Sequence, residues 1–416
     1  MMKNKGLMVV VALIIVGLLV NFAYIMNQKI ELTLYFHPDK LGFVSKSIEE
    51  FEQLNPKIRV KLIELPDDTN AKYEVLNNAL ALEDGSIDII DTDVIWPAIF
   101  VDAGWVEPLD GYFTEEELSS LLESAVDAGT INNELYAIPY RIDSGMLFYR
   151  SDLLEKYGRP VPKTWDDLIQ TSKIIMNGET NMYGLAGSWY EYEGLTCNYL
   201  EYLWSNNGAV FKNGQDLALN TSEAKEALNM MVDMIYAHGI VPPDVTTYTS
   251  GDVRKQFLDE NLIFMRDWPA GWRKLNEDSS SVKGKVQVAP LPSFTANGSS
   301  HGTFGGWMFM ISKHSEHKEE AAEFIKFMIS EEKEKEMVLT HNYLPILKSL
   351  YSDPDIIEQM PFIDNMLPYF NSAKPRPRVA YYDKISYILQ NEVTKALTGQ
   401  ITPEEASENM QERITE

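Results

Sequence analysis

Cysteine is almost absent from this chain, because Cys197 is the single cysteine among 416 residues. One thiol cannot form an intramolecular disulfide, and it cannot supply the ligands of a four-cysteine metal site. A lone cysteine of this kind is usually a free and buried thiol. Disulfide-stapled scaffolds and cysteine-rich zinc modules are therefore excluded.

Basic residues are also scarce. The chain has 36 Lys and Arg against 62 Asp and Glu, which gives a formal net charge of −26 at pH 7. An acidic surface repels nucleic-acid phosphates and anionic lipid headgroups, although the acidity needs no explanation beyond solubility. The sequence therefore predicts no nucleic-acid partner. The length and a hydrophobic content of 45% indicate a globular chain with room for two substantial lobes.

Two common catalytic signatures are missing as well, since neither G-x-x-x-x-G-K-[ST] nor H-E-x-x-H occurs. His314 and His317 have a spacing that could bind a metal on one helix face, but they lie in the polar run KHSEHKEE with no third ligand nearby. A solvated helix start explains them better. The sequence thus predicts no metal and no cofactor. Paired carboxylates for glycoside hydrolysis need to meet only in space, so this enzyme alternative stays open.

The N-terminal residues carry the main indication of location. Lys3 and Lys5 precede an uncharged stretch, residues 6–28, with LMVVVALIIVGLLV at its centre. About 20 apolar residues in a helix cross a hydrocarbon core of about 30 Å, and the lysines place the chain start in the cytoplasm. Residues 1–28 are therefore predicted to anchor the chain at the outer face of the cytoplasmic membrane. The alternative is a removed signal segment, with a periplasmic or secreted product, although Asn21-Phe22-Ala23 is a poor cleavage site.

Strand and helix patterns alternate after this segment. Residues 30–36 and 58–62 alternate between apolar and polar side chains, residues 48–54 and 75–80 show helical spacing, and residues 87–90 form an apolar run. This order predicts an α/β chain with a mostly parallel sheet and helices on both faces.

Three further helix starts are predicted from local signals. Thr164 with Asp167 resembles a capping box, Ser315 precedes a helical stripe, and Thr402 with Glu405 combines a cap with an N3 carboxylate.

Aromatic residues are plentiful, with 8 Trp and 21 Tyr. Trp96, Trp189, Trp268 and Trp307 each stand beside carboxylates, glycines or prolines. Core packing is the simpler interpretation of any single one. Together they suit a sugar, because aromatic rings cover its apolar faces while charged groups bind its hydroxyl rim.

Seven segments, in order along the chain, carry a resemblance to a known family. They are AGWVEPLDGYF (103–113), LYAIPYRIDSGMLFYRSDLLEKYG (135–158), YEGLTCNYLEYLWSNNG (192–208), MRDWPAGW (265–272), GKVQVAPLP (284–292), FGGWMFMISKHS (304–315) and GQITPEEA (399–406). From about residue 30 to its C-terminus the chain resembles family 1 extracellular solute-binding proteins, the maltose-binding-protein group, and especially its trehalose/maltose-type branch.

The resemblance implies a two-lobed, type II periplasmic-binding-protein-like α/β fold, in which each lobe has a mostly parallel sheet flanked by helices. Three hinge crossings are expected, near residues 141–145, 288–293 and 311–314. Lobe 1 is then 29–141 with 293–312, and lobe 2 is 142–292 with 313–416. The implied protein is a monomeric, non-enzymatic binding protein of an ABC sugar importer, which binds a small maltose- or trehalose-like oligosaccharide in the interlobe cleft and delivers it to the permease subunits. A cell-surface glycoside-acting enzyme or a ligand-sensing ectodomain is the alternative.

The resemblance also nominates ligand-binding residues, with Trp272 as a substitute for Trp268. The set is Asp93, Arg141, Asp143, Tyr192, Glu193, Trp268, Gly306, Trp307 and Arg376. Arg141 stands where a relative carries an aromatic residue, Asp39 and Lys40 occupy the place of an expected glutamate, and Lys72 is the single cation of the second such loop. These departures leave the sugar unnamed, and an acidic sugar stays possible.

Overall fold

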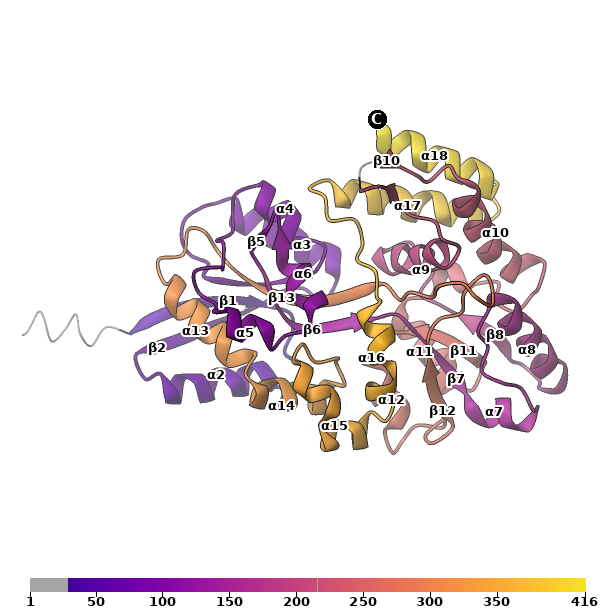
Figure 1. The fold of residues 1–416 in the computed structure, drawn as a ribbon, viewed down its shortest axis with the longest axis horizontal. Helices are drawn as coiled ribbons and strands as arrows, with labels where there is room; N and C mark the ends of the chain where they lie inside the picture. The colour runs from indigo at the N-terminus through magenta and orange to yellow at the C-terminus, as the bar shows by residue number, and fades with distance from the viewer. Residues whose placement is uncertain (1–28, 215) are drawn as a thin grey trace, which may run out of the picture. The chain divides into compact units, whose positions relative to one another are not determined.

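The computed structural model describes residues 29–214 and 216–416, which form two compact units (Figure 1). Unit 1 runs to Asp91 and adds Ile311–Met328, while unit 2 comprises Thr92–Met310 and Ile329–Glu416. The predicted anchor or signal, residues 1–28, lies outside the described residues. Within the described residues, no helix is both long and apolar enough to cross a bilayer. These units are groups of densely contacting residues, so the lobe boundaries and hinge crossings stay predictions.

Unit 1 is a parallel sheet with helices. Its elements are β1 (Ile30–Phe36), α2 (Phe43–Leu54), β2 (Ile58–Glu64), α3 (Thr69–Leu80), the first residues of β3 (Ile89–Asp93), and α13 (Lys318–Met328). β1 pairs in parallel with both β2 and β3, with Ile30 opposite Ile58 and Leu34 opposite Ile89. The alternating pattern of β1 buries Leu32 and Leu34, as its sequence predicts.

The second segment of unit 1 completes its core. The ring of Phe324 in α13 meets the ring of Phe51 in α2 edge to face, with 5.1 Å between their centroids. Ser315 does not cap this helix, which contradicts the prediction. α13 begins only at Lys318, and the Ser315 hydroxyl donates to Asp88 at 2.5 Å. The same hydroxyl accepts a hydrogen bond from the His317 amide at 3.1 Å, so it binds a backbone group just before the helix and not one within its first turn.

Unit 2 contains most of the strands and helices. Its strands, besides the end of β3, are β4 (Thr130–Ile131), β5 (Glu134–Leu135), β6 (Ile138–Ser144), β7 (Met146–Arg150), β8 (Tyr183–Ala186), β9 (Phe211–Lys212), β10 (Asp216–Leu217), β11 (Leu262–Asp267), β12 (Val286–Ala289) and β13 (Phe304–Ile311). Its α-helices are α4 (Pro97–Asp102), α5 (Glu115–Ser119), α6 (Glu123–Gly129), α7 (Ser151–Lys156), α8 (Trp165–Gly178), α9 (Glu193–Ser205), α10 (Ser222–Tyr236), α11 (Ser250–Leu258), α12 (Gly271–Asn276), α14 (Glu331–His341), α15 (Pro354–Gln359), α16 (Ile363–Asn371), α17 (Tyr382–Leu397) and α18 (Pro403–Thr415).

The four-stranded sheet of unit 2 is mixed, in the order β12-β7-β11-β8. β7 is antiparallel to both β11 and β12, whereas β11 is parallel to β8. The expected mostly parallel sheet therefore holds in unit 1 but not here.

Local helix signals elsewhere in unit 2 are confirmed. Thr164 and Asp167 form a full capping box at the start of α8, and Thr402 and Glu405 form another at the start of α18. Helices α9, α10, α17 and α18 pack against one another (Figure 1).

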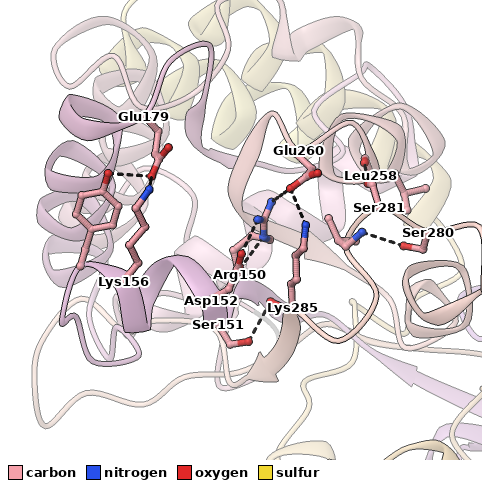
Figure 2. Close-up of polar contacts among 12 residues, drawn as sticks. Arg150, Ser151, Asp152, Lys156, Glu179, Leu258, Glu260, Ser280, Ser281 and Lys285 are labelled. Carbon is pink, nitrogen blue, oxygen red and sulfur yellow. Dashed lines mark hydrogen bonds and ion pairs between the residues drawn. The ribbon is translucent and has the colours of Figure 1, made fainter.

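An ion-pair network holds one end of this sheet (Figure 2). Arg150, the last residue of β7, binds Asp152 through two hydrogen bonds of 2.8 and 2.7 Å and approaches Glu260 at 3.0 Å. Lys285 binds the same Glu260 carboxylate at 3.2 Å. The two cations and two anions neutralise each other's charge. The cluster therefore has a structural role: it links β7 to the residues that follow α11 and precede β12.

Candidate functional site

The site begins on two paired strands of unit 2. β6 and β13 are antiparallel, with Arg141 opposite Trp307 and Asp143 opposite Gly305. Alternate residues of a strand share a face, and so do residues directly opposite each other. Nη1 of Arg141 accordingly donates to Oδ2 of Asp143 at 2.6 Å, and Cζ of Arg141 lies 5.7 Å from the Trp307 ring centroid.

The Trp307 ring packs against a second tryptophan. It meets the ring of Trp96 edge to face, with centroids 6.0 Å apart at an angle of 88°. Trp96 is buried, at 3% exposure, whereas Trp307 is only partly buried. Trp307 therefore keeps part of its ring accessible while its neighbour fixes its orientation.

Two glycines before Trp307 allow this close packing. A Cβ on Gly305 would lie 3.1 Å from the Trp268 ring and 3.3 Å from Cβ of Asp143. Gly306 has φ of +145°, and a Cβ there would lie 2.5 Å from the Arg141 carbonyl oxygen. The backbone conformation at position 306 requires glycine. At position 305, the absence of a side chain lets the Trp268 ring approach the strand.

Trp268 lies in the turn between β11 and α12, over a buried ion pair. Cζ of Arg266 is 4.0 Å from its ring centroid. Arg266 binds both carboxylate oxygens of Glu201 in α9, with Nε 2.8 Å from Oε2. The Thr303 amide also donates to Glu201, at 3.0 Å. A cation held in this way gives the Trp268 ring a fixed and favourable partner on one face.

Arg376 joins two more of the nominated carboxylates. It lies between α16 and α17 and donates to Asp93 at 3.1 Å and to Glu193 at 2.7 Å. Glu193 opens α9 and also accepts hydrogen bonds from Tyr382 and Ser386 of α17. One guanidinium group thus connects the end of β3 with two helices.

Asp143 is a buried carboxyl group of the site with a raised pKa. Burial raises its pKa to about 6, against the lowering effect of Arg141, and the nearby charge of Asp93 raises it further. Its Oδ1 is buried and accepts no hydrogen bond from the described residues. Such an oxygen is suited to accept a hydrogen bond from a hydroxyl group.

The structure brings eight of the nine nominated residues into this region. Arg141, Asp143, Gly306, Trp307 and Trp268 gather around β6 and β13. Asp93, Glu193 and Arg376 form the second group, and the effect of Asp93 on Asp143 connects the two groups.

Tyr192 directly precedes Glu193 at the start of α9, but its hydroxyl is directed to another element, because it accepts a hydrogen bond from the Ser250 amide at 3.2 Å, at the start of α11. Trp272, the substitute for Trp268, has a structural role. Its indole donates to the Gln359 carbonyl at 2.8 Å, and its ring packs on Phe362. The ligand-binding roles of all nine residues stay predictions.

Sequence reasoning did not find Arg266, Glu201 or Tyr343. Arg266 could have been predicted from the sequence, because it stands two residues before Trp268 in the motif MRDWPAGW. Glu201 lies inside an almost wholly buried helix, and the sequence contains no sign of its partner. Trp189, which shares the local context of the site tryptophans, is fully buried.

In unit 1, the residues that depart from the family pattern lie in different environments. Lys40 pairs with Asp67 at 2.5 Å, and both side chains are exposed. Lys72 is 2% exposed and lies within α3. Lys72 therefore lies on a helix and not in a loop, which corrects its expected placement.

One segment matches the serine-hydrolase pattern G-x-S-x-G, namely GSSHG at 298–302. It lies outside the helices and strands, not on a strand-to-helix turn. Ser300 donates to the Leu291 carbonyl, and His301 contacts the Ser372 carbonyl at 2.8 Å. The serine and the histidine point to different backbone partners, so this segment is not a nucleophile with its base. Within the described residues no group of His, Cys, Asp and Glu could hold a metal ion.

The chain belongs to the bacterial extracellular solute-binding protein family, whose profile matches residues 38–335. The chain is similar to maltose-bound MalE3 of T. maritima, with 38% identity, a TM-score of 0.86 and coverage of 93% of this chain and 99% of that one. It is also similar to a probable ABC transporter-binding protein of Deinococcus radiodurans, at 28% identity over 85% of this chain and 86% of the relative. The GacH receptor of Streptomyces glaucescens shares the fold, with 22% identity, a TM-score of 0.80 and coverage of 92% and 97%.

These similarities confirm the predicted family and its two-lobed periplasmic-binding-protein fold class. They also confirm that the chain is a solute-binding protein of the sugar ABC transporter type and not an enzyme.

Proposed function

We propose that the chain binds a small maltose- or trehalose-like oligosaccharide between the rings of Trp268 and Trp307, closes its two predicted lobes on it, and delivers it to the permease of an ABC importer. One observation supports this above the others. Two partly exposed tryptophans each lie over an arginine that is ion-paired with a buried carboxylate. Sugar rings stack on such indole faces, while the polar groups around them bind hydroxyls.

Named relatives support an oligosaccharide. The T. maritima MalE3 structure is described as maltose-bound. Relatives at 22% identity are described as an arabinooligosaccharide-binding protein in Bacillus subtilis and a maltotriose-binding protein in Pyrococcus abyssi.

Calorimetry on the soluble fragment from Asn27 tests the proposal, with a panel of neutral and acidic mono- and oligosaccharides. We expect a dissociation constant in the micromolar range or tighter, about −8 kcal/mol. Chromatography of the recovered sugar should show it unchanged. No sugar binding, together with clear binding of amino acids or metal ions, would disprove it; a cleaved sugar would favour the glycoside-acting alternative.

Delivery to a permease and anchoring by residues 1–28 are separate parts of the proposal. Uptake of the labelled sugar should fall in cells that lack this chain and recover when it is restored. Mass spectrometry of protein extracted from its native membrane should find the original N-terminus. A mature chain that begins near Tyr24 would show instead that the segment is a removed signal.

A further inference from the structure

Tyr343 lies against the candidate site from a loop that is distant in sequence. Cζ of Arg141 is 3.9 Å from the centroid of the Tyr343 ring, closer than its 5.7 Å distance to Trp307. The same ring also faces the His341 ring, nearly parallel at 12° with 4.9 Å between centroids. We propose that Tyr343 is a positioning residue, which fixes the plane of the Arg141 guanidinium and thereby directs its hydrogen bonds toward Asp143 and the ligand.

The backbone around Tyr343 is fixed on both sides. Asn342 ends α14 in the left-handed conformation, with φ of 58°, and its amide donates to the Val338 carbonyl at 2.7 Å. On the other side, the Leu344 carbonyl accepts a hydrogen bond from the Ile142 amide at 3.2 Å. Ile142 stands between Arg141 and Asp143 in β6, so this bond places Tyr343 directly beside the pair.

A buried carboxylate holds the remainder of this loop. The Ile346 amide donates at 3.0 Å to Oε2 of Glu334, which is fully buried in α14. Burial raises the pKa of Glu334 well above its usual value. The loop that carries Tyr343 is thus hydrogen-bonded to β6 at Leu344 and to α14 at Ile346. These two bonds restrict the backbone on the C-terminal side of Tyr343 and so help to fix the position of its ring.

Stacking on Tyr343 has a definite consequence for Arg141. A guanidinium group donates only within its own plane. A ring stacked on its face therefore sets the directions of its hydrogen bonds and leaves its edges free to make them. One edge meets Oδ2 of Asp143 at 2.6 Å. Without the ring, the long arginine side chain gains other rotamers, and both its bond to Asp143 and its bonds to a ligand lose their fixed geometry.

The first arm of the test uses the ligand-free chain and does not depend on sugar binding. The pKa of Asp143 is measured by NMR titration in the wild type, Tyr343→Ala and Tyr343→Phe. Arg141 lowers the pKa of Asp143, so a loosened Arg141 lowers it less. We expect the pKa to rise in Tyr343→Ala and to stay at the wild-type value in Tyr343→Phe, which retains the ring. An unchanged pKa in Tyr343→Ala would overturn the proposal.

The second arm rests on the proposed function and uses calorimetry with the neutral oligosaccharide that the wild type binds best. Tyr343→Ala should weaken binding roughly tenfold, the magnitude of one cation–π contact, and Tyr343→Phe should restore it. In an Arg141→Ala background, Tyr343→Ala should cause no further loss, because the ring acts through the arginine. Tyr387→Ala, at a tyrosine that is 61% exposed on α17, is the matched control and should leave affinity unchanged.

The outcomes of the two arms are distinguishable. If Tyr343→Ala weakens binding equally with and without Arg141, the ring contacts the sugar itself and positioning is wrong. If the wild type binds no sugar, the proposed function fails, while the titration arm still decides the role of Tyr343. A melting temperature for each variant shows whether any loss of affinity reflects loss of folded protein.

Discussion

The indole ring of Trp268 lies over the guanidinium group of Arg266, with 4.0 Å between Cζ and the ring centroid. Trp307 has the same relationship with Arg141, at 5.7 Å. Both arginines are ion-paired with buried carboxylates, and both rings remain partly exposed. Each ring is thus oriented by a charged partner while its remaining surface stays accessible, which is the arrangement of a binding surface.

Truncation of either ring should therefore affect binding more than folding. We expect Trp268→Ala and Trp307→Ala each to weaken sugar binding by roughly 1–3 kcal/mol, with little change in melting temperature. Trp272→Ala is the matched control, because Trp272 is 6% exposed and packs on Phe362. Its loss should cost about 3–5 kcal/mol of stability. Calorimetry and thermal unfolding measure the two effects, and a large melting drop with unchanged affinity at position 268 or 307 would mean that these rings belong to the core.

Gly305 offers a more conservative test of the Trp268 position. A Cβ at this position would lie 3.1 Å from the Trp268 ring, and the residue has no left-handed φ. Gly305→Ala should therefore displace the Trp268 ring, and with it the Asp143 side chain at 3.3 Å, and weaken binding by about 1 kcal/mol without backbone strain. Gly111→Ala is the control, since its Cβ would meet no atom within 4 Å. Equal affinities for the two variants, measured by calorimetry, would show that the ring does not need this approach.

Asp143 should make stability fall as pH rises through the weakly acidic range. Its pKa is about 6 in the folded chain, mainly because of burial, against an ordinary value of 3.8. Between these two values the folded state binds more protons than the unfolded state, so the free energy of unfolding falls as pH rises from about 4 to about 6. A shift of about two pKa units corresponds to about 3 kcal/mol. Below and above this window the contribution of Asp143 is constant.

Asp143→Asn isolates this effect from other titrating carboxyl groups, because the amide does not ionise. Urea unfolding of both chains between pH 4 and pH 7 should show the wild type losing stability relative to the variant as pH rises. Parallel stability curves would mean that Asp143 titrates at its ordinary pKa.

Arg376 and Arg150 form a matched pair of buried arginines with different surroundings. The carboxylate partners of Arg376 are 13% and 14% exposed, whereas those of Arg150 are 37% and 40% exposed. Arg376→Met leaves two poorly hydrated carboxylates without their cation, so it should cost about 3–5 kcal/mol of stability and weaken sugar binding. Arg150→Met lets water replace the lost partner, so it should cost less and leave affinity unchanged. Chemical denaturation and calorimetry measure both, and an equal stability loss would show that partner exposure does not matter.

Local patterns in the sequence predicted local structure well. Residues 30–90 alternate between strand and helix because burial on one face dictates the periodicity of each element. The capping boxes at Thr164 and Thr402 were predictable because each involves a side chain and a backbone group three residues apart. The carboxylates and tryptophans of the site were nominated by family motifs, and the structure gathers most of them.

Contacts that depend on distant parts of the chain could not be predicted in this way. Ser315 had the right neighbours for a helix cap, but the helix begins only at Lys318, and the hydroxyl bridges the His317 amide and Asp88. Trp96 and Trp268 have similar neighbours in sequence, but Trp96 is buried against Phe100 and Trp307, whereas Trp268 lies over Arg266 and stays partly exposed. The stacking of Tyr343 on Arg141 required the loop after α14 to meet β6.

The division of unit 1 into two stretches of chain has a consequence for its synthesis. Residues up to Asp91 leave the ribosome first, and all of residues 92–310 follow before α13 is made. The apolar face of α2, where Phe51 meets Phe324, is therefore without its partner helix through most of translation. The first strands to appear therefore gain their complete core only when Met328 has been made, so this early sheet must stay unaggregated while residues 92–310 are synthesised.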